Sequence, residues 1–528
     1  MASSDTQQGG DWKKRETLGS AFIQIAVVAA VLVLAVFAVY KRGTTRKELA
    51  ELMRDARAAA IKGNPADLRK GASIAGQALE KDPKMPDALA FSASVYTDLW
   101  TLHREDGAEQ KAKDFLDRAR KADAQTEERY GAEALQLVAA GQPKQADEFV
   151  ESLRKKGASS AKLFYAQGLA LKQLGNLQLA RTGFTTAMDK SWKDPIYSAA
   201  WGELIIAEGG IGAMDAFTKS LGSNPDYFRA KLGLALSRVM RKDKVGEAET
   251  MVKEVLARDT ELSPPLKARA LAIQAAVLVY QEQPDQAMSM ADQALALAGD
   301  DVWALFAKAN ALALKKDAAA PAAYDAVISK DRTSPVFYFE GAQRLQAAGM
   351  TPAAMALLDK YEATFKDVKN TTADNKVVAW LDRDDKYWLT RGDLFREQGK
   401  LEEAMAAYDK AIAARGLSLQ KAYYAKGAVF LAKKDYDNAA TMLRDITPPD
   451  GTGQLAEAYA AMGEVMFAKK EWGEGCQNYA YALTRFKAQQ LPREQLNALL
   501  GDVEKKLRTS GQPQIAKVWI EQAKPLIE

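Results

Sequence analysis

The chain opens with an uninterrupted apolar run. Residues 21–40 read AFIQIAVVAAVLVLAVFAVY, and Gln24 is the only strongly polar member. About twenty apolar residues are what a helix needs to cross the hydrocarbon core of a bilayer. A buried soluble helix would not be bounded so sharply by charge, and a cleaved signal peptide has a shorter apolar core and a small-residue cleavage site. We expect an N-terminal tail over residues 1–20 and an uncleaved transmembrane helix over residues 21–40.

Basic residues lie on both sides of this run, three before it and four after it: Lys13, Lys14 and Arg15, then Lys41, Arg42, Arg46 and Lys47. The positive-inside rule therefore discriminates little. If the large domain stayed in the cytoplasm, the short tail would have to cross the membrane with three positive charges. For a bacterial host we expect a single-pass protein of the inner (cytoplasmic) membrane with its large domain in the periplasm.

Beyond the run, small and large residues recur with a period close to 34. In the segment that begins at residue 164 the order is large, small, large, small, aromatic, small: Phe164, Gly168, Leu171, Ala180, Phe184 and Ala187. Later copies keep these offsets: Trp388, Gly392, Phe395, Ala404, Tyr408 and Ala411; Tyr423, Gly427, Phe430, Ala439, Leu443 and Ile446; Tyr459, Gly463, Met466, Gly475, Tyr479 and Ala482. The step from Gly168 to Gly202 is 34 residues. A period of this length is typical of stacked helical hairpins.

This pattern resembles the tetratricopeptide repeat (TPR) family, although copies such as that with Gly475 depart from it. Small residues let the two helices of a hairpin approach closely, and we expect the aromatic residue to fill the gap to the next hairpin. The resemblance implies an all-α fold, in which the transmembrane helix precedes a right-handed α-solenoid of roughly ten to twelve hairpins. The residues expected to pack the repeats are Phe164, Gly168, Ala180, Phe184, Trp388, Gly392, Ala404, Tyr408, Gly427, Ala439, Gly463 and Tyr479.

One segment interrupts the repeats. Residues 367–386 are longer and more polar than an ordinary inter-helix turn, which indicates an inserted loop or a join between two solenoid blocks. We place the blocks at residues 41–366 and 387–511. Residues 512–528 are amphipathic and are expected to form a helix that caps the last hairpin.

Composition and charge favour a solvated helical array. The 73 basic and 69 acidic side chains are interspersed and leave a net charge of +4, which does not indicate a nucleic-acid-binding face. His103 and Cys476 are the only residues of their types and are far apart in an extended stack. Phosphate-binding loops, paired-cysteine metal sites and nucleophile motifs are absent from the sequence. We therefore expect no enzymatic activity, no cofactor, no metal, no nucleic-acid partner and no small-molecule substrate.

In the TPR family the first helix of each hairpin lines a concave face. The positions next to the signature residues would then form a groove: Tyr165, Leu169, Lys172, Leu389, Asp393, Arg396, Tyr424, Leu431, Glu464 and Phe467. This mixture of aromatic and charged residues suits an extended or helical peptide of a protein partner. The other interpretation is that they are merely the exposed residues of a spacer.

The sequence therefore favours a membrane-anchored scaffold or adaptor. Its role would be protein–protein interaction in the assembly of a bacterial envelope complex, serving secretion, motility or outer-membrane biogenesis. One alternative is a cytoplasm-facing adaptor that recruits soluble proteins to the membrane. Another is an envelope factor that handles glycans.

Overall fold

The computed structural model describes residues 12–210, 212–371 and 376–528, with side chains at 22–34, 45–210, 212–369 and 376–528. The chain divides into two compact units, Met1–Ala139 and Ala140–Glu528. Almost every described residue belongs to a helix or to a short turn between helices. The expected all-helical, TPR-like stack is confirmed, and each unit is considered by itself below.

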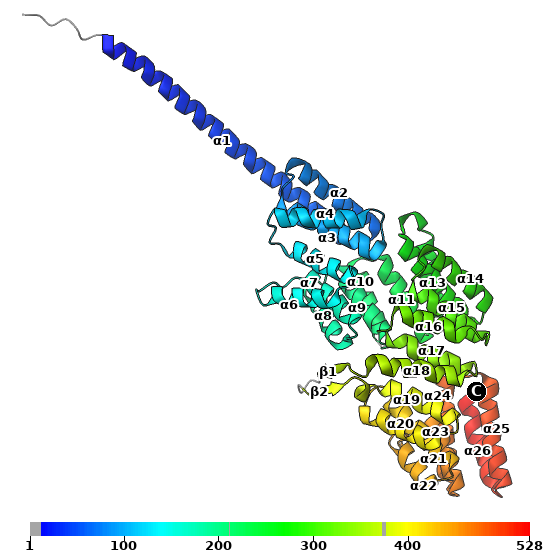
Figure 1. Cartoon of the computed structure of the whole chain (residues 1–528). Coiled ribbons are helices and arrows are strands. Elements are labelled where there is room, and N and C mark those ends of the chain that lie inside the picture. Colours follow the sequence, from blue (N-terminus) through cyan, green and yellow to red (C-terminus); the bar gives the residue numbers. More distant parts are fainter. Residues whose placement is uncertain (1–11, 211, 372–375) are drawn as a thin grey trace, which may run out of the picture. The chain divides into compact units, whose positions relative to one another are not determined.

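The first unit contains five helices among its described residues: α1 (Trp12–Ala60), α2 (Pro65–Lys81), α3 (Pro86–His103), α4 (Ala108–Lys121) and α5 (Glu127–Ala139). The C-terminal part of α1 packs against α2, and its N-terminal part projects beyond the other helices of the unit (Figure 1). Met53 of α1 and Leu89 of α3 are buried in their shared core. Arg57 pairs with Asp87 at 2.5 Å and with Glu128 at 3.0 Å, which ties α1 to α3 and α5.

The apolar run lies within α1 but only partly within the described side chains. Ala21 and residues 35–40 lie outside them. The large apolar side chains between Phe22 and Leu34 are 56–71% exposed and are distributed around the whole helix. Among the side chains that the structure describes, no helix carries an apolar stretch long enough to cross a membrane.

The second unit is a succession of antiparallel helical hairpins that follows α6 (Pro143–Arg154). The hairpins are α7/α8 (Ala161–Gln173, Leu177–Lys190), α9/α10 (Pro195–Ala207, Ala213–Ser223), α11/α12 (Phe228–Arg241, Val245–Leu256), α13/α14 (Pro264–Tyr280, Pro284–Leu297), α15/α16 (Val302–Leu314, Ala320–Lys330), α17/α18 (Pro335–Ala347, Thr351–Phe365), α19/α20 (Asp385–Glu397, Leu401–Ala414), α21/α22 (Leu419–Ala432, Tyr436–Arg444), α23/α24 (Ala456–Ala468, Trp472–Ala488) and α25/α26 (Arg493–Thr509, Pro513–Ile527). Two short 3₁₀ helices, η1 (Asp259–Glu261) and η2 (Leu381–Arg383), lie between hairpins. Each first helix contacts its own second helix, and from α9 to α21 each first helix also contacts the first helix of the next hairpin, as stacking in series requires.

Small residues of the first helices lie directly under large residues of the second helices. A Cβ atom on Gly168 would meet the Phe184 ring at 2.8 Å, and one on Gly463 would meet the Tyr479 ring at 2.7 Å. The ring therefore covers the glycine of its own hairpin. It also borders the next hairpin in several copies: Tyr479 lies 6.5 Å from Trp519 of α26, and the Phe217 ring lies against both Gly202 of its own hairpin and Gly233 of the next.

The polar insertion lies inside the second unit. It forms a two-stranded antiparallel sheet, β1 (Lys369–Thr371) and β2 (Val377–Ala379), in which Lys369 faces Ala379. Trp380 follows β2 and donates its indole N–H to the Tyr361 hydroxyl at 2.7 Å. The insertion is thereby fixed to α18. The segment expected as a cap, residues 512–528, contains helix α26.

The row of first helices in the second unit curves back on itself. Helix α9 contacts α17, four hairpins further along the chain. Lys172 of α7 lies 3.8 Å from Asp331, which precedes α17. Burial raises the pKa of Asp331, but Lys172 and the hydroxyl groups of Ser334 and Thr333 outweigh burial, so this pKa lies below its ordinary value. The pair is therefore an ion pair at neutral pH.

Candidate partner-binding pocket on the first helices of the second unit

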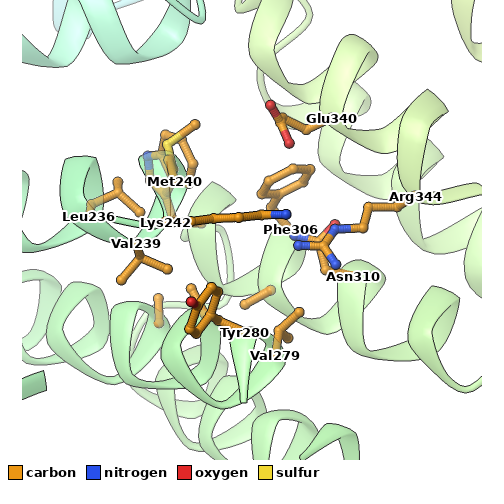
Figure 2. Close-up of a pocket in the computed structure, with 14 residues that line it drawn as sticks. Leu236, Val239, Met240, Lys242, Val279, Tyr280, Phe306, Asn310, Glu340 and Arg344 are labelled. Atoms are coloured by element: carbon orange, nitrogen blue, oxygen red, sulfur yellow. The ribbon is translucent and has the colours of Figure 1, made fainter. Parts of the chain in front are cut away.

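A pocket opens on four successive first helices, α11, α13, α15 and α17 (Figure 2). Its volume is about 60 Å³. That space holds roughly four water molecules, which is the size of one aliphatic side chain and well below that of a cofactor site. The lining residues are Leu236, Val239, Met240, Lys242, Ala272, Ala276, Val279, Tyr280, Trp303, Phe306, Ala307, Asn310, Glu340 and Arg344.

The floor of the pocket is apolar and well ordered by ring packing. Trp303 and Phe306 lie edge to face at 5.9 Å between ring centroids, and both pack against Phe337, at 5.0 and 5.1 Å. Such aromatic pairs resist rearrangement because each ring is held by several neighbours. Ala276 and Ala307 also line the pocket and fill little of its space, since their side chains are single methyl groups. The hollow is thus supported by the fold itself.

Polar groups gather at one side of this apolar floor. Lys242 extends across the pocket toward Arg344 and Asn310, while Glu340 lies on the other side of Lys242 (Figure 2). Asn310 is buried and its side-chain oxygen accepts a hydrogen bond from the Tyr324 hydroxyl at 2.7 Å. That bond fixes the amide so that its nitrogen remains a donor.

The charged groups of the rim lack internal partners. Within the described part of the chain, no ion pair or hydrogen bond joins Lys242, Glu340 or Arg344 to another side chain. Lys242 caps the C-terminus of α11 with a left-handed backbone, φ 55°, and its side chain is exposed. Arg344 is half-buried. The rim therefore carries two cations and one carboxylate, a local excess of one positive charge.

A larger hollow, of about 380 Å³, lies between α6, α7 and α8. Its charged side chains are already engaged. Gln167 donates to Asp147 at 2.8 Å and to Glu151 at 2.7 Å, and Glu151 also pairs with Arg154. This hollow is the larger of the two, but its polar groups already bond to one another. They therefore have less hydrogen-bonding capacity left for a ligand than the unpaired rim of the smaller pocket has.

The predicted groove residues of α7 are not free to contact a partner as expected. Tyr165 is only 1% exposed, because its ring packs between Phe184 and Tyr197 at 6.0 and 5.5 Å. Leu169 is half-buried. Lys172 forms the ion pair with Asp331 described above.

The predicted residues of α19 and α21 do come together. Asp393 accepts a hydrogen bond from the Tyr408 hydroxyl at 2.8 Å and lies 3.7 Å from Arg396. Burial raises the pKa of Asp393, and these neighbours only partly offset it. Burial raises the pKa of Tyr424 of α21, and the charges of Asp393 and Arg396 are close enough to affect this pKa as well. Leu389 and Leu431 are half-buried on the same two helices.

The two predicted residues of α23 serve packing. Glu464 accepts a hydrogen bond from the Tyr479 hydroxyl at 2.7 Å and pairs with Lys506 of α25. Phe467 is 7% exposed and packs edge to face against Tyr479 at 5.4 Å. Glu464 thus joins α23 to the next hairpin and Phe467 packs within its own hairpin, so neither presents a free group to a ligand.

A further charged cluster lies on α9 and α11. Glu203 accepts two hydrogen bonds from the Arg229 guanidinium, at 2.6 and 2.5 Å. Burial raises the pKa of Glu203, but Arg229, Arg269 and Lys172 outweigh it, so the net shift is downward. The pair is bidentate, which makes it a structural feature of the inner helices, while the remaining guanidinium nitrogen of Arg229, Nη1, is buried without a hydrogen-bond partner among the described residues.

In the described part of the chain, no set of three His, Cys, Asp or Glu side chains could hold a metal ion. Burial raises the pKa of the Cys476 thiol to about 11, which keeps it protonated and unreactive at neutral pH.

Sequence reasoning missed the pocket for a definite reason. Its helices belong to degenerate repeats, and Glu340 and Arg344 flank Gly341 at offsets other than those taken to line the groove. A usable signal was present, since Gly341 and Phe337 mark the hairpin and place Arg344 one turn further along the same helix.

The comparisons with known proteins agree with repeats of this kind. The family model described as Tetratricopeptide repeat matches residues 389–452, which covers all but the first residue of the copy predicted from residue 388. No curated protein sequence matches the chain significantly.

The solved structures that match the chain have low sequence identity to it. The human IFIT1 dimer with PPP-AAAA has 16% identity and a TM-score of 0.42, and the alignment covers 76% of this chain and 94% of that one. The APC/C hetero-tetramer Cut9-Hcn1 has 12% identity and a TM-score of 0.39, covering 90% and 93%. MamA has 19% identity and a TM-score of 0.26, covering 34% and 96%. Similarities this weak identify neither a partner nor an activity.

Proposed function

We propose that this chain is a membrane-anchored, TPR-like adaptor that holds a protein partner on the first helices of its second unit during assembly of a bacterial envelope complex. The observation that carries the proposal is the pocket on α11–α17, in which an unpaired charged rim lies beside a rigid apolar floor. Stable complexes concentrate binding energy in such small apolar pockets bordered by polar groups. A mere spacer has no need of either feature.

The binding role is tested by photo-crosslinking in cells. Tyr280 lines the pocket and is 43% exposed, so replacing it with p-benzoylphenylalanine places a crosslinker at the opening. We expect one dominant protein adduct that disappears when Ala276→Trp fills the pocket. The matched control, Ala413→Trp on the exposed side of α20, should leave the adduct unchanged. Failure to form an adduct, or an adduct that persists in Ala276→Trp, would refute the role of the pocket.

The membrane anchor rests on the exposed apolar side chains of α1. Large apolar residues from Phe22 to Leu34 point in all directions around the helix, so a single protein neighbour could not cover them. A lipid environment covers every face at once. We place the helix in the inner membrane and the second unit in the periplasm.

The orientation is tested by cysteine labelling in a Cys476→Ser background. Glu528→Cys puts a thiol at the exposed last residue. A membrane-impermeant maleimide should label it once the outer membrane is permeabilised. Labelling only after the inner membrane is broken would exclude the periplasmic orientation and favour the cytoplasm-facing adaptor.

The proposal includes binding without catalysis and without a nucleic-acid partner. The remaining alternative is an envelope factor that handles glycans. Glycan turnover by the purified chain, together with recovery of no protein partner, would overturn the adaptor role.

A further inference from the structure

We infer that the pocket on α11–α17 binds one aliphatic side chain of the protein partner, and that the residue next to this aliphatic residue in the partner's sequence is an Asp or Glu. This inference rests on the proposed function, because it specifies the segment that the adaptor would hold.

The apolar half of the ligand follows from the floor. Phe306, Val239 and Val279 offer surface without hydrogen-bonding groups, and the space of about 60 Å³ fits a Leu, Ile or Met side chain. A larger aromatic ring would have to displace rings that are each held by two or more others. Aliphatic residues are therefore the size class that enters without rearrangement.

The acidic half of the ligand follows from the rim. Lys242 and Arg344 point toward one another across the pocket, although like charges repel (Figure 2). The amide nitrogen of Asn310 adds a third donor, oriented by the Tyr324 hydroxyl. A carboxylate among these three donors would cancel the excess positive charge, because Glu340 contributes the only other anion among the lining residues. Arginine and asparagine donors suit a carboxylate in particular.

Two other occupants share part of this chemistry. A fatty acid also combines an aliphatic group with a carboxylate, but its chain needs far more room than the hollow of about 60 Å³ offers. A second copy of this chain could present such a segment as well. The size of the pocket and its position on the inner helices favour a short peptide segment of a protein partner, and the experiment separates the three.

The test is a selection of random 12-residue peptides displayed on phage against the full chain in detergent. We expect selected peptides to share Leu, Ile or Met next to Asp or Glu. Synthetic versions should bind about tenfold more weakly when the acid is replaced by its amide, and at least about thirtyfold more weakly when the aliphatic residue becomes Ala.

The decisive variant is Lys242→Glu with Arg344→Glu. Its selected peptides should carry Lys or Arg beside the aliphatic residue, which a structural role of the two cations would not produce. The control, Arg415→Glu with Lys434→Glu, makes the same change of net charge at two exposed residues that have left-handed backbones as Lys242 does, and it should select the same peptides as the wild type. Circular dichroism and thermal melting verify that all variants are folded.

The outcomes are distinct. Peptides without an acidic preference, or a preference that survives the double reversal, would overturn this inference and leave the adaptor role intact. No enrichment by the wild type would count against both. Displacement of peptides by laurate, or a dimer that dissociates in the double variant, would assign the pocket to a fatty acid or to a second copy.

Discussion

Replacing Gly392 by Ala tests the close packing on which the repeats depend. Gly392 lies in α19 directly beneath the Tyr408 ring, and an added Cβ would lie 2.5 Å from one ring carbon and 2.7 Å from the next. Tyr408 is fully buried, and its hydroxyl is held by Asp393 at 2.8 Å. The ring therefore cannot swing aside without losing both its packing and its hydrogen bond.

The magnitude follows from the distances. Carbon atoms pack at about 3.5–4.0 Å, so the ring would have to retreat by about 1 Å. Overpacking of this kind costs about 1–3 kcal/mol, while Ala in a helix gains about 1 kcal/mol over Gly. Gly501 in α25 is the matched control, because a Cβ there meets nothing within 4 Å and only the gain remains. The two variants should differ by about 1–3 kcal/mol in the free energy of unfolding.

The assay is urea denaturation followed by circular dichroism, with hydrogen exchange to localise the loss to α19–α21, since repeat arrays unfold in sections. A double variant, Gly392→Ala with Tyr408→Leu, should recover part of the loss, because the chain already pairs Gly427 with Leu443. If Gly392→Ala were as stable as Gly501→Ala, the packing argument would be refuted.

Three further predictions concern charge and burial. The lowered pKa of Asp331 contributes stability that is present above about pH 4 and is lost as the carboxylate protonates at lower pH. The Tm advantage of the wild type over Asp331→Asn should therefore disappear as the pH falls below about 4. A difference in Tm that stays constant with pH would contradict the ion pair with Lys172. Glu203→Gln should lower the free energy of unfolding by about 1–3 kcal/mol at pH 7, because it leaves the Arg229 guanidinium half-buried without its carboxylate, and an unchanged urea midpoint would refute this. Cys476, with its pKa of about 11, should react with a maleimide at pH 7 much more slowly in the folded chain than in urea, and equal rates would refute the burial of this thiol.

The helical hairpins could be predicted from sequence because their signals are local. Gly392 and Tyr408 are 16 residues apart, and a hairpin brings them together whatever the rest of the chain does. The same holds for Gly463 and Tyr479. The repeat period therefore determined the fold class before any contact between distant hairpins was known.

Local sequence signals could not show whether a polar side chain is paired with another part of the chain. Lys172 was expected in an open groove, yet its partner Asp331 comes from a hairpin much further along the chain. Glu464 was expected to face a ligand and instead pairs with Lys506. Both partners depend on how each hairpin is rotated against the next, and small rotations accumulate along a stack.

By itself, the sequence determined that the chain forms stacked helical hairpins and carries an apolar run near its N-terminus, because these features depend on residues close together in the chain. Only the tertiary structure decided that Lys242 and Arg344, 102 positions apart, share one rim and remain unpaired there. A pocket formed by four successive helices has no local sequence signature, since its shape depends on the angles and distances between those helices.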